Sequence, residues 1–380
     1  MRIAHRAPHG PVDTRPRPTW WRAAAAAAGA VGLSASADAR WTVTNLHPAG
    51  ATASWAFGVS GTRQVGYAQV GAVQHASLWN GSAASWVDLH PAGVNWYSSE
   101  AWGAGGTRQV GRALWGGTPH AALWNGTAAS WINLTPSGAT ESIAWGTSGA
   151  QQVGYAKIGS TIRAGRWSGS AASWVSLHPA DATWSEALGT SGTQQVGFAR
   201  IAGSDRAGLW SGTAASWVSL HPANSTWSEA LGTSGTRQVG FASVGGTIRA
   251  SLWSGTAASW IDLSPPGASW SEARGIFGTR QIGFARVGGV SRASIWSGGA
   301  SSWVDLSLAL SGSWGDTFAN GIWSDGTWTY VAGYGLNNIT RRREALLWVI
   351  PAPGGALALA LAGFITARRQ RRCILRAIAG

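Results

Sequence analysis

The stretch that decides the fold runs from Trp174 to Trp217 and reads WVSLHPADATWSEALGTSGTQQVGFARIAGSDRAGLWSGTAASW. Almost the same text returns between Trp217 and Trp260, and looser copies lie on both sides. Repetition of one unit every ~20–50 residues is typical of solenoids and propellers. The leucine that ends each copy recurs in steps of 43 residues, with one step of 45, at Leu46, Leu89, Leu134, Leu177, Leu220, Leu263 and Leu306.

Each copy divides into four short apolar runs separated by Gly, Ser, Thr or Pro, which is the pattern of strands joined by tight turns. In the reference copy the runs are 184–189, 194–201, 206–210 and 217–220. Four strands in about 40–45 residues is the content of one propeller blade. The sequence therefore predicts an all-β chain of four-stranded repeats of ~43 residues.

The number of blades follows from three markers, namely the Gly of the second strand and the Trp residues of the third and fourth strands. Each marker occurs seven times. The chain begins on a fourth strand and ends on a third, so we expect the strand at 41–46 to complete the last blade beside residues 314–348. Such closure removes the free sheet edge. The prediction is a seven-bladed β-propeller that spans residues 41–348.

The net charge of +13 is concentrated at the two ends of the chain. Residues 1–40 carry six arginines against two aspartates, and residues 341–380 carry eight against one glutamate. The repeats between them are nearly neutral, which argues against a basic binding face, so we expect no nucleic-acid partner. The single cysteine, Cys373, allows no intrachain disulfide, and stability must come from packing.

Residues 1–39 have the features of an export signal. Arginines precede the apolar run 23–33, and small-residue cleavage patterns follow at 35–37 and 37–39. The alternative is an Ala-rich tail without a signal function. We expect an exported protein.

The segment 349–372 combines a Pro-Ala-Pro turn, a short apolar run and a cluster of four arginines, and a tail follows at 373–380. Arginines just beyond an apolar segment favour the cytoplasmic side of a membrane. This order resembles the PEP-CTERM sorting signals of bacterial proteins. The resemblance implies a short membrane-spanning anchor at the cell envelope and a sorting or processing enzyme that acts at residues 349–372.

The repeat resembles that of the HAF-repeat extracellular proteins. The third strand of two copies reads Gln74-His75-Ala76-Ser77-Leu78-Trp79 and Pro119-His120-Ala121-Ala122-Leu123-Trp124, after a Gln-Val-Gly strand and before Trp-x-x-Leu. The resemblance covers most of residues 41–348. It implies export and a repeat architecture, and no activity.

One acidic position recurs in the first strand of four blades, at Glu100, Glu186, Glu229 and Glu272. In a propeller this strand lines the central channel, where carboxylates could bind a cation or a polar ligand. In three blades an arginine also recurs in the third strand, at Arg206, Arg249 and Arg292. We therefore favour structural Glu–Arg pairs within each blade over a binding ring.

Other repeated residues are predicted to build the fold. The histidines at His47, His90, His178 and His221 lie one per blade in Leu-His-Pro turns and cannot form one metal site. The paired tryptophans are expected to pack between blades and not to act as sugar platforms. No nucleophile elbow, phosphate loop or metal-ligand cluster occurs, so we predict no catalytic residue, cofactor or metal.

The sequence therefore predicts a non-enzymatic binding or structural module at the cell surface or in an extracellular matrix. Its partner would be a glycan or an extracellular protein. The alternative is a propeller hydrolase that acts on extracellular polysaccharide. Acidic residues that occur once and gather at one channel mouth would favour the hydrolase, whereas repeated ones favour the binding module.

Overall fold

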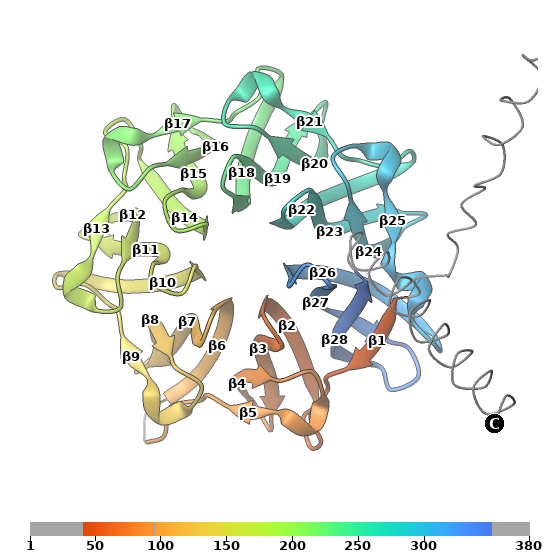
Figure 1. The fold of residues 1–380 in the computed structure, drawn as a ribbon. Coiled ribbons are helices and arrows are strands. Elements are labelled where there is room, and N and C mark those ends of the chain that lie inside the picture. The colour runs from red at the N-terminus through yellow and green to blue at the C-terminus, as the bar shows by residue number, and fades with distance from the viewer. Residues whose placement is uncertain (1–40, 94–95, 352–380) are drawn as a thin grey trace, which may run out of the picture. The chain divides into compact units, whose positions relative to one another are not determined.

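The computed structural model describes residues 41–93 and 96–351. These residues form seven antiparallel sheets of four strands each, arranged as a ring around a central axis (Figure 1). The chain is thus a seven-bladed β-propeller, as the repeat predicted. The segments assigned to a signal (1–39), to an anchor beyond Pro351 and to the tail (373–380) lie outside the described residues.

The blades follow one another along the chain, each with its first strand at the axis (Figure 1). Blade 1 contains β2 (Ala53–Ser60), β3 (Arg63–Val70), β4 (Val73–Trp79) and β5 (Val87–Asp88). Blade 2 contains β6 (Trp96–Gly105), β7 (Arg108–Trp115), β8 (Thr118–Trp124) and β9 (Ile132–Asn133). Blade 3 contains β10 (Ala139–Thr147), β11 (Gln152–Ile158), β12 (Thr161–Trp167) and β13 (Val175–Ser176). Blade 4 contains β14 (Trp184–Thr190), β15 (Gln195–Ile201), β16 (Ser204–Trp210) and β17 (Val218–Ser219).

Blade 5 contains β18 (Ser225–Ser234), β19 (Arg237–Val244), β20 (Thr247–Trp253) and β21 (Ile261–Asp262). Blade 6 contains β22 (Ala268–Phe277), β23 (Arg280–Val287), β24 (Val290–Trp296) and β25 (Val304–Asp305). Blade 7 contains β26 (Trp314–Ser324), β27 (Trp328–Asn337) and β28 (Arg342–Pro351), with β1 (Thr42–Asn45) as its outer strand. In blades 1–6 a single 3-10 turn leads into a fourth strand of only two residues, shorter than the sequence pattern suggested.

Ring closure occurs as predicted, because β1 pairs with β28 in blade 7. The pairing is antiparallel, with register from Thr42 opposite Val349 to Asn45 opposite Leu346. In Figure 1 the red-orange start of the described chain lies beside the blue end. Strand β28 continues to Pro351, opposite Trp328. Residues 349–351, which the sequence assigned to the C-terminal segment, therefore belong to the propeller.

A buried hydrogen bond joins every blade to the next. In blade 4, the Ser185 hydroxyl on the first strand accepts a bond of 2.9 Å from the Ala164 amide on the third strand of blade 3. The same bond joins all seven junctions, with Thr317 replacing Ser in blade 7 and Ser54 closing the ring to Ala345. Since Ser185 is fully buried, its hydroxyl satisfies an amide that water cannot reach.

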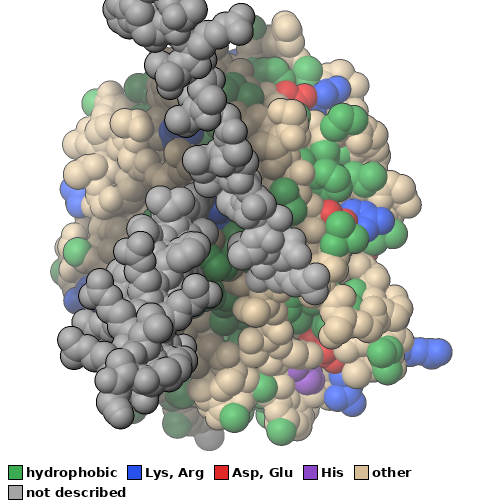
Figure 2. All heavy atoms as spheres, turned by 45° about the vertical axis from the view of Figure 1, so that its right-hand side comes forward, with side chains coloured by type: hydrophobic (Ala, Val, Ile, Leu, Met, Phe, Trp, Pro, Cys, Tyr) green, Lys and Arg blue, Asp and Glu red, His purple; other side chains and the backbone are tan. Residues whose placement is uncertain are grey.

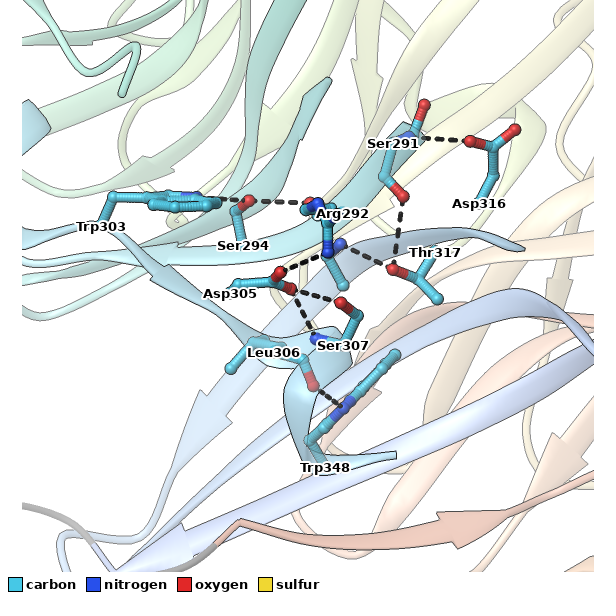
Figure 3. A network of polar contacts seen from close by, with 11 residues as sticks. Ser291, Arg292, Ser294, Trp303, Asp305, Leu306, Ser307, Asp316, Thr317 and Trp348 are labelled. Carbon is cyan, nitrogen blue, oxygen red and sulfur yellow. Dashed lines mark hydrogen bonds and ion pairs between the residues drawn. The ribbon is translucent and has the colours of Figure 1, made fainter. Parts of the chain in front are cut away.

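The junction between blades 6 and 7 carries the irregular part of the repeat (Figure 3). Here the Thr317 hydroxyl lies 2.8 Å from the Ala293 amide, and Asp316 accepts a bond from the Ser291 amide at 2.7 Å. Nearby, the Asp305 carboxylate accepts a hydrogen bond of 3.0 Å from the Arg292 guanidinium. The extra aspartate holds the longer last blade against its regular neighbour, whereas the ion pair joins the third and fourth strands within blade 6.

The tryptophans of the third strands form the core between blades, as expected. All seven are fully buried: Trp79, Trp124, Trp167, Trp210, Trp253, Trp296 and Trp348. Their clusters mix residues of neighbouring blades; one example unites Val65 and Leu89 of blade 1 with Ala101 and Trp124 of blade 2. The fourth-strand tryptophans are partly buried against the same clusters. These rings are therefore structural, not exposed platforms.

The glycine in the middle of each second strand permits a close contact within one blade. A Cβ on Gly197 would lie 1.9 Å from the Glu186 carbonyl oxygen, on the first strand of the same sheet. The register explains this, since Ala187 faces Gly197 just before a β-bulge that shifts the first strand.

We predict that Ser185→Ala lowers the free energy of unfolding by about 1–3 kcal/mol, because the buried Ala164 amide loses its acceptor. Chemical denaturation of the full chain measures the change. The matched control is Ser211→Ala, on an exposed serine of the same blade, with an expected change within about 0.5 kcal/mol. Equal effects of the two substitutions would contradict the role of the junction bond.

Candidate functional site

The residues that face the channel come from seven equivalent β-bulges. In each first strand, one residue has no partner on the second strand, whereas the alanine before it and the glycine after it are both paired. In blade 4 the unpaired residue is Leu188, between Ala187 and Gly189. A bulge redirects its extra side chain. The seven unpaired residues are Phe57, Trp102, Trp145, Leu188, Leu231, Arg274 and Asn320.

The channel narrows where the seven glycines follow these bulges. A Cβ on Gly189 would lie 2.7 Å from the Leu231 carbonyl oxygen of the next blade, and one on Gly321 would lie 2.7 Å from Phe57. The same contact recurs around the ring, with the last blade meeting the first. Only glycine allows the inner strands to come this close. The space at this waist measures about 180 Å³.

A wider cavity of about 460 Å³ lies beside this waist, where the bulge residues of all seven blades gather. One wall is aromatic, with the Trp102 and Trp145 rings 4.4 Å apart and Phe57 beside them. Leu188 and Leu231 form an aliphatic wall, and the carboxylates of Glu186 and Glu229 line the same space. We refer to this cavity as the channel mouth.

The predicted pairing of the first-strand glutamates with the third-strand arginines is wrong. Strand register places Arg206 opposite Ala199 and Ser185, whereas Glu186 stands opposite Phe198 and Ala207. Neighbouring positions of a strand point to opposite faces of the sheet, so the two side chains are kept apart. The arginines of the third strand instead meet the fourth strand, as Arg249 meets Asp262 at 2.7 Å and Arg292 meets Asp305 at 3.0 Å.

Two of the four predicted carboxylates have arginine partners at the channel. Glu100 binds Arg112, its neighbour on the second strand, at 2.6 Å. Glu272 binds Arg274, two residues along its own strand, at 3.0 Å. Arg274 also donates to the Asn320 side chain at 2.8 Å. Neither glutamate lines the cavity, and both charges are balanced.

The other two carboxylates face the cavity without an arginine. Glu186 is 9% exposed and accepts two indole N–H bonds, from Trp145 at 2.9 Å and from Trp184 at 3.0 Å. Glu229 is partly buried, and no described residue donates a hydrogen bond to its carboxylate. Nearby Arg200 is held by Asp205 through two bonds of 2.7 and 2.9 Å.

This environment favours the protonated form of both acids. Burial raises the pKa of Glu186 to about 7, although the two indole donors oppose the shift. Burial, with the neighbouring charges of Glu186, Asp205 and Glu272, raises the pKa of Glu229 to about 8, against the effect of Arg200. An ionised Glu229 is thus unfavourable in the free protein, and a cation in the cavity would stabilise it.

The turn histidines support the blade junctions and form no common site. Each shares a hydrogen bond with a junction serine, as His178 does with Ser185 at 2.7 Å. Thr135 and Ser264 take this place in the two remaining regular blades. Within residues 41–93 and 96–351, no three metal-ligating side chains gather.

Other hollows and surfaces offer less chemistry. A hollow of about 580 Å³ between the turn at 47–51 and Arg342 is lined mainly by small apolar residues. Trp115, 53% exposed, borders another of about 410 Å³. Figure 2 shows a face on which basic side chains are scattered, some beside acidic ones, among apolar and small polar groups. None of these brings charged groups together as the channel mouth does.

Helices of the length and hydropathy needed to cross a bilayer do not occur in the described part of the chain.

Comparisons with known proteins support the fold alone. No family model matches the chain, and no curated protein matches it in sequence. The propeller domain of the Trilobed protease from Pyrococcus furiosus superimposes with a TM-score of 0.53 at 9% identity, covering 78% of this chain and 94% of that one. A puromycin hydrolase variant complexed with PGG gives 0.50 at 14% identity, covering 77% of this chain. The aligned region spans 53% of that hydrolase.

A prolyl endopeptidase is similar to the same degree, with a TM-score of 0.50, 11% identity, and coverage of 77% of this chain and 48% of that one. Each of these three proteins is a propeller or contains one, and each shares only 9–14% identity with this chain. The similarity therefore shows that this protein has a propeller fold.

We predict that Gly189→Ala lowers the free energy of unfolding by about 1–3 kcal/mol, because the new methyl group would press on the Leu231 carbonyl of the next blade. Thermal and chemical denaturation measure the effect. As the control, Gly299→Ala introduces a methyl group into open space at an extended backbone position. If both variants were as stable as the parent, close packing at the waist would not limit the fold.

We predict a pH-dependent contribution from the turn histidines. Burial lowers their pKa below the ordinary value of 6.5, so below that pH the unfolded chain binds more protons than the folded one. Their contribution to stability therefore falls as the pH drops from about 6.5. Replacing all four by threonine, as at Thr135, should reduce this fall.

Denaturation of the parent and the variant at matched pH values isolates the contribution of the histidines. Glu186 and Glu229 raise stability as the pH falls, but they do so equally in both proteins, so their effect cancels in the difference. Parallel pH curves would refute the prediction.

Proposed function

We propose that this protein is an exported, non-enzymatic propeller that binds a glycan or an extracellular protein at its channel mouth. The observation that carries the proposal is the unpaired Glu229, which faces a cavity bordered by Trp102 and Trp145. A partly buried carboxylate with a raised pKa and no partner reduces stability, and such groups gather at functional sites.

The variation between blades supports a binding role at this place. The repeats agree at structural positions, while the bulge position carries Phe, Trp, Leu, Arg or Asn. One side of the cavity is therefore aromatic, another aliphatic and a third polar. An asymmetric lining within a symmetric scaffold suits a ligand that binds in one orientation.

Export and attachment to the cell envelope are part of the proposal. Their support is the resemblance of the repeats to HAF-repeat proteins, the signal-like segment 1–39 and the PEP-CTERM-like segment that ends at 372. A sorting enzyme would act on that C-terminal segment. Fractionation of cells that produce the full chain, with and without residues 352–380, tests this part: retention of both forms in the cytoplasm would refute it.

The alternative function is a hydrolase that acts on extracellular polysaccharide. It is favoured by two carboxyl groups in one cavity, Glu186 and Glu229, since glycoside hydrolysis uses a pair of them, one as a protonated acid with a raised pKa and one as a carboxylate. Against it, both belong to the repeated series and stand at equivalent positions of neighbouring blades. Repetition at equivalent positions is the pattern of construction, whereas each catalytic role needs its own position.

We predict that full-length protein binds a glycan or protein partner without turning it over, and that Trp145→Leu weakens binding about tenfold or more. Leucine already occupies this position in the next two blades, at Leu188 and Leu231, so the fold should tolerate it. Glycan-array binding, binding to extracellular proteins and polysaccharide turnover are measured together.

Trp115→Ala is the control, because Trp115 borders a different hollow. Binding that is unaffected by Trp145→Leu would refute the channel mouth as the site. Turnover abolished by Glu186→Gln or Glu229→Gln would establish the hydrolase instead.

A further inference from the structure

We propose that the channel mouth binds an organic cation, namely a primary ammonium group on a short apolar chain. This inference rests on the proposed binding role and specifies the chemistry of the ligand. It follows from the charges, the walls and the free hydrogen-bond capacity of the cavity.

The charges at the mouth leave two carboxylates without a cation. The arginines near it are all engaged: Arg112 with Glu100, Arg274 with Glu272, and Arg200 with Asp205. When ionised, Glu186 and Glu229 therefore give the cavity an uncompensated negative charge, since no described cationic side chain bonds to either. An anionic ligand would be repelled, and a cation would be attracted.

The hydrogen-bond capacity is concentrated on Glu229. Both oxygens of Glu186 already accept indole N–H bonds, from Trp145 and Trp184. The Glu229 oxygens accept none from the described residues. An ammonium group supplies up to three N–H donors, so it would satisfy Glu229 directly while Glu186 contributes its charge at longer range.

The walls favour an organic cation over a metal ion. A calcium ion takes about six to eight oxygen ligands, and the mouth offers two carboxylates, one of them occupied. The Trp102 and Trp145 rings instead line the cavity, and aromatic rings attract alkylammonium groups. Leu188 and Leu231 provide an apolar surface for the chain that carries the ammonium.

In blade 6 an arginine of the protein itself neutralises the equivalent carboxylate. In this blade Glu272 stands where Glu229 stands in blade 5, and Arg274 stands where Leu231 stands. There the guanidinium at the bulge position neutralises the carboxylate at 3.0 Å and lies 4.7 Å from the Phe284 ring centre. Blade 5 has the carboxylate but a leucine in place of the cation. The ligand would supply the missing charge.

The experiment titrates full-length protein with n-pentylammonium by calorimetry at pH 9, where Glu229 is mostly ionised and the amine is still mainly protonated. Binding is expected, with neutral n-pentanol binding at least tenfold more weakly. Glu229→Gln should weaken binding by roughly tenfold or more, since a charge-assisted bond is lost. Equal binding of pentanol, or unchanged binding by this variant, would overturn the proposal.

A second variant copies blade 6 into blade 5. Leu231→Arg places a guanidinium two residues after Glu229, as Arg274 follows Glu272, and should abolish binding while the protein stays folded. Glu141→Gln is the control: it removes one charge from a residue that pairs with Lys157 and does not line the cavity. Loss of binding in Glu141→Gln equal to that in Glu229→Gln would refute a specific site.

Affinity should also rise from pH 6 to pH 9, because the cation binds the ionised form of Glu229. Burial and the charges of Glu186, Asp205 and Glu272 disfavour that form, and Arg200 favours it. A pH-independent affinity would contradict the proposal. Calcium chloride that binds more tightly than pentylammonium would show a metal site and overturn it.

The source of the ammonium is distinguished by two further probes, an N-acetyl-lysine amide and glucosamine. Compared at pH 7, tighter binding of the first indicates a lysine side chain of a protein, whereas tighter binding of the second, an amino sugar without an apolar chain, would overturn the proposal. If a partner binds at the mouth but n-pentylammonium neither binds nor competes with it, the ligand class is wrong while the binding role stands. If Trp145→Leu affects the binding of no partner, the channel mouth is not the binding site.

Discussion

The structure depends on one buried bond repeated at every junction, from a backbone amide of one blade to a hydroxyl of the next. In blade 3, the carbonyl oxygen of Ala164 on the third strand accepts a hydrogen bond from the Leu177 amide. The Ala164 amide donates a hydrogen bond to the Ser185 hydroxyl of blade 4. One residue thus joins its own outer strand to the neighbouring blade. A small residue is required there, because a larger side chain would separate the two sheets. The buried tryptophans of the third strands then fill the space between neighbouring sheets.

The same spacing determines the channel. Blades held this closely bring their inner strands together at the axis, and the glycine ring is the result. The bulge before each glycine turns one side chain per blade into the channel. Positions that must be glycine or serine are therefore fixed by packing, while the bulge position is free to vary. Binding chemistry can differ between blades without disturbing the contacts that hold them.

Much of the architecture could be predicted from the sequence, because it is encoded by spacing. The seven-fold recurrence of the second-strand glycine and of the third- and fourth-strand tryptophans indicated the blade number, and the displaced start of the chain indicated the closure by β1. The charge pairs could not be predicted in this way. Glu186 and Arg206 recur together in three blades, yet the alternation of side chains along a strand sends them to opposite faces. A signal for the true pairing was present, since Asp262 and Asp305 follow Arg249 and Arg292 at a constant distance of 13 residues.

Closure by β1 and β28 also has a consequence for the order of events during synthesis. Thr42 pairs with Val349, so the first strand to leave the ribosome has no partner until more than three hundred further residues have been made. Six blades can assemble in sequence through local hairpins, but the ring cannot close before β28 has been made. Pairing of strands so far apart in the sequence is also slow. Blade 7 is therefore the last blade to be completed.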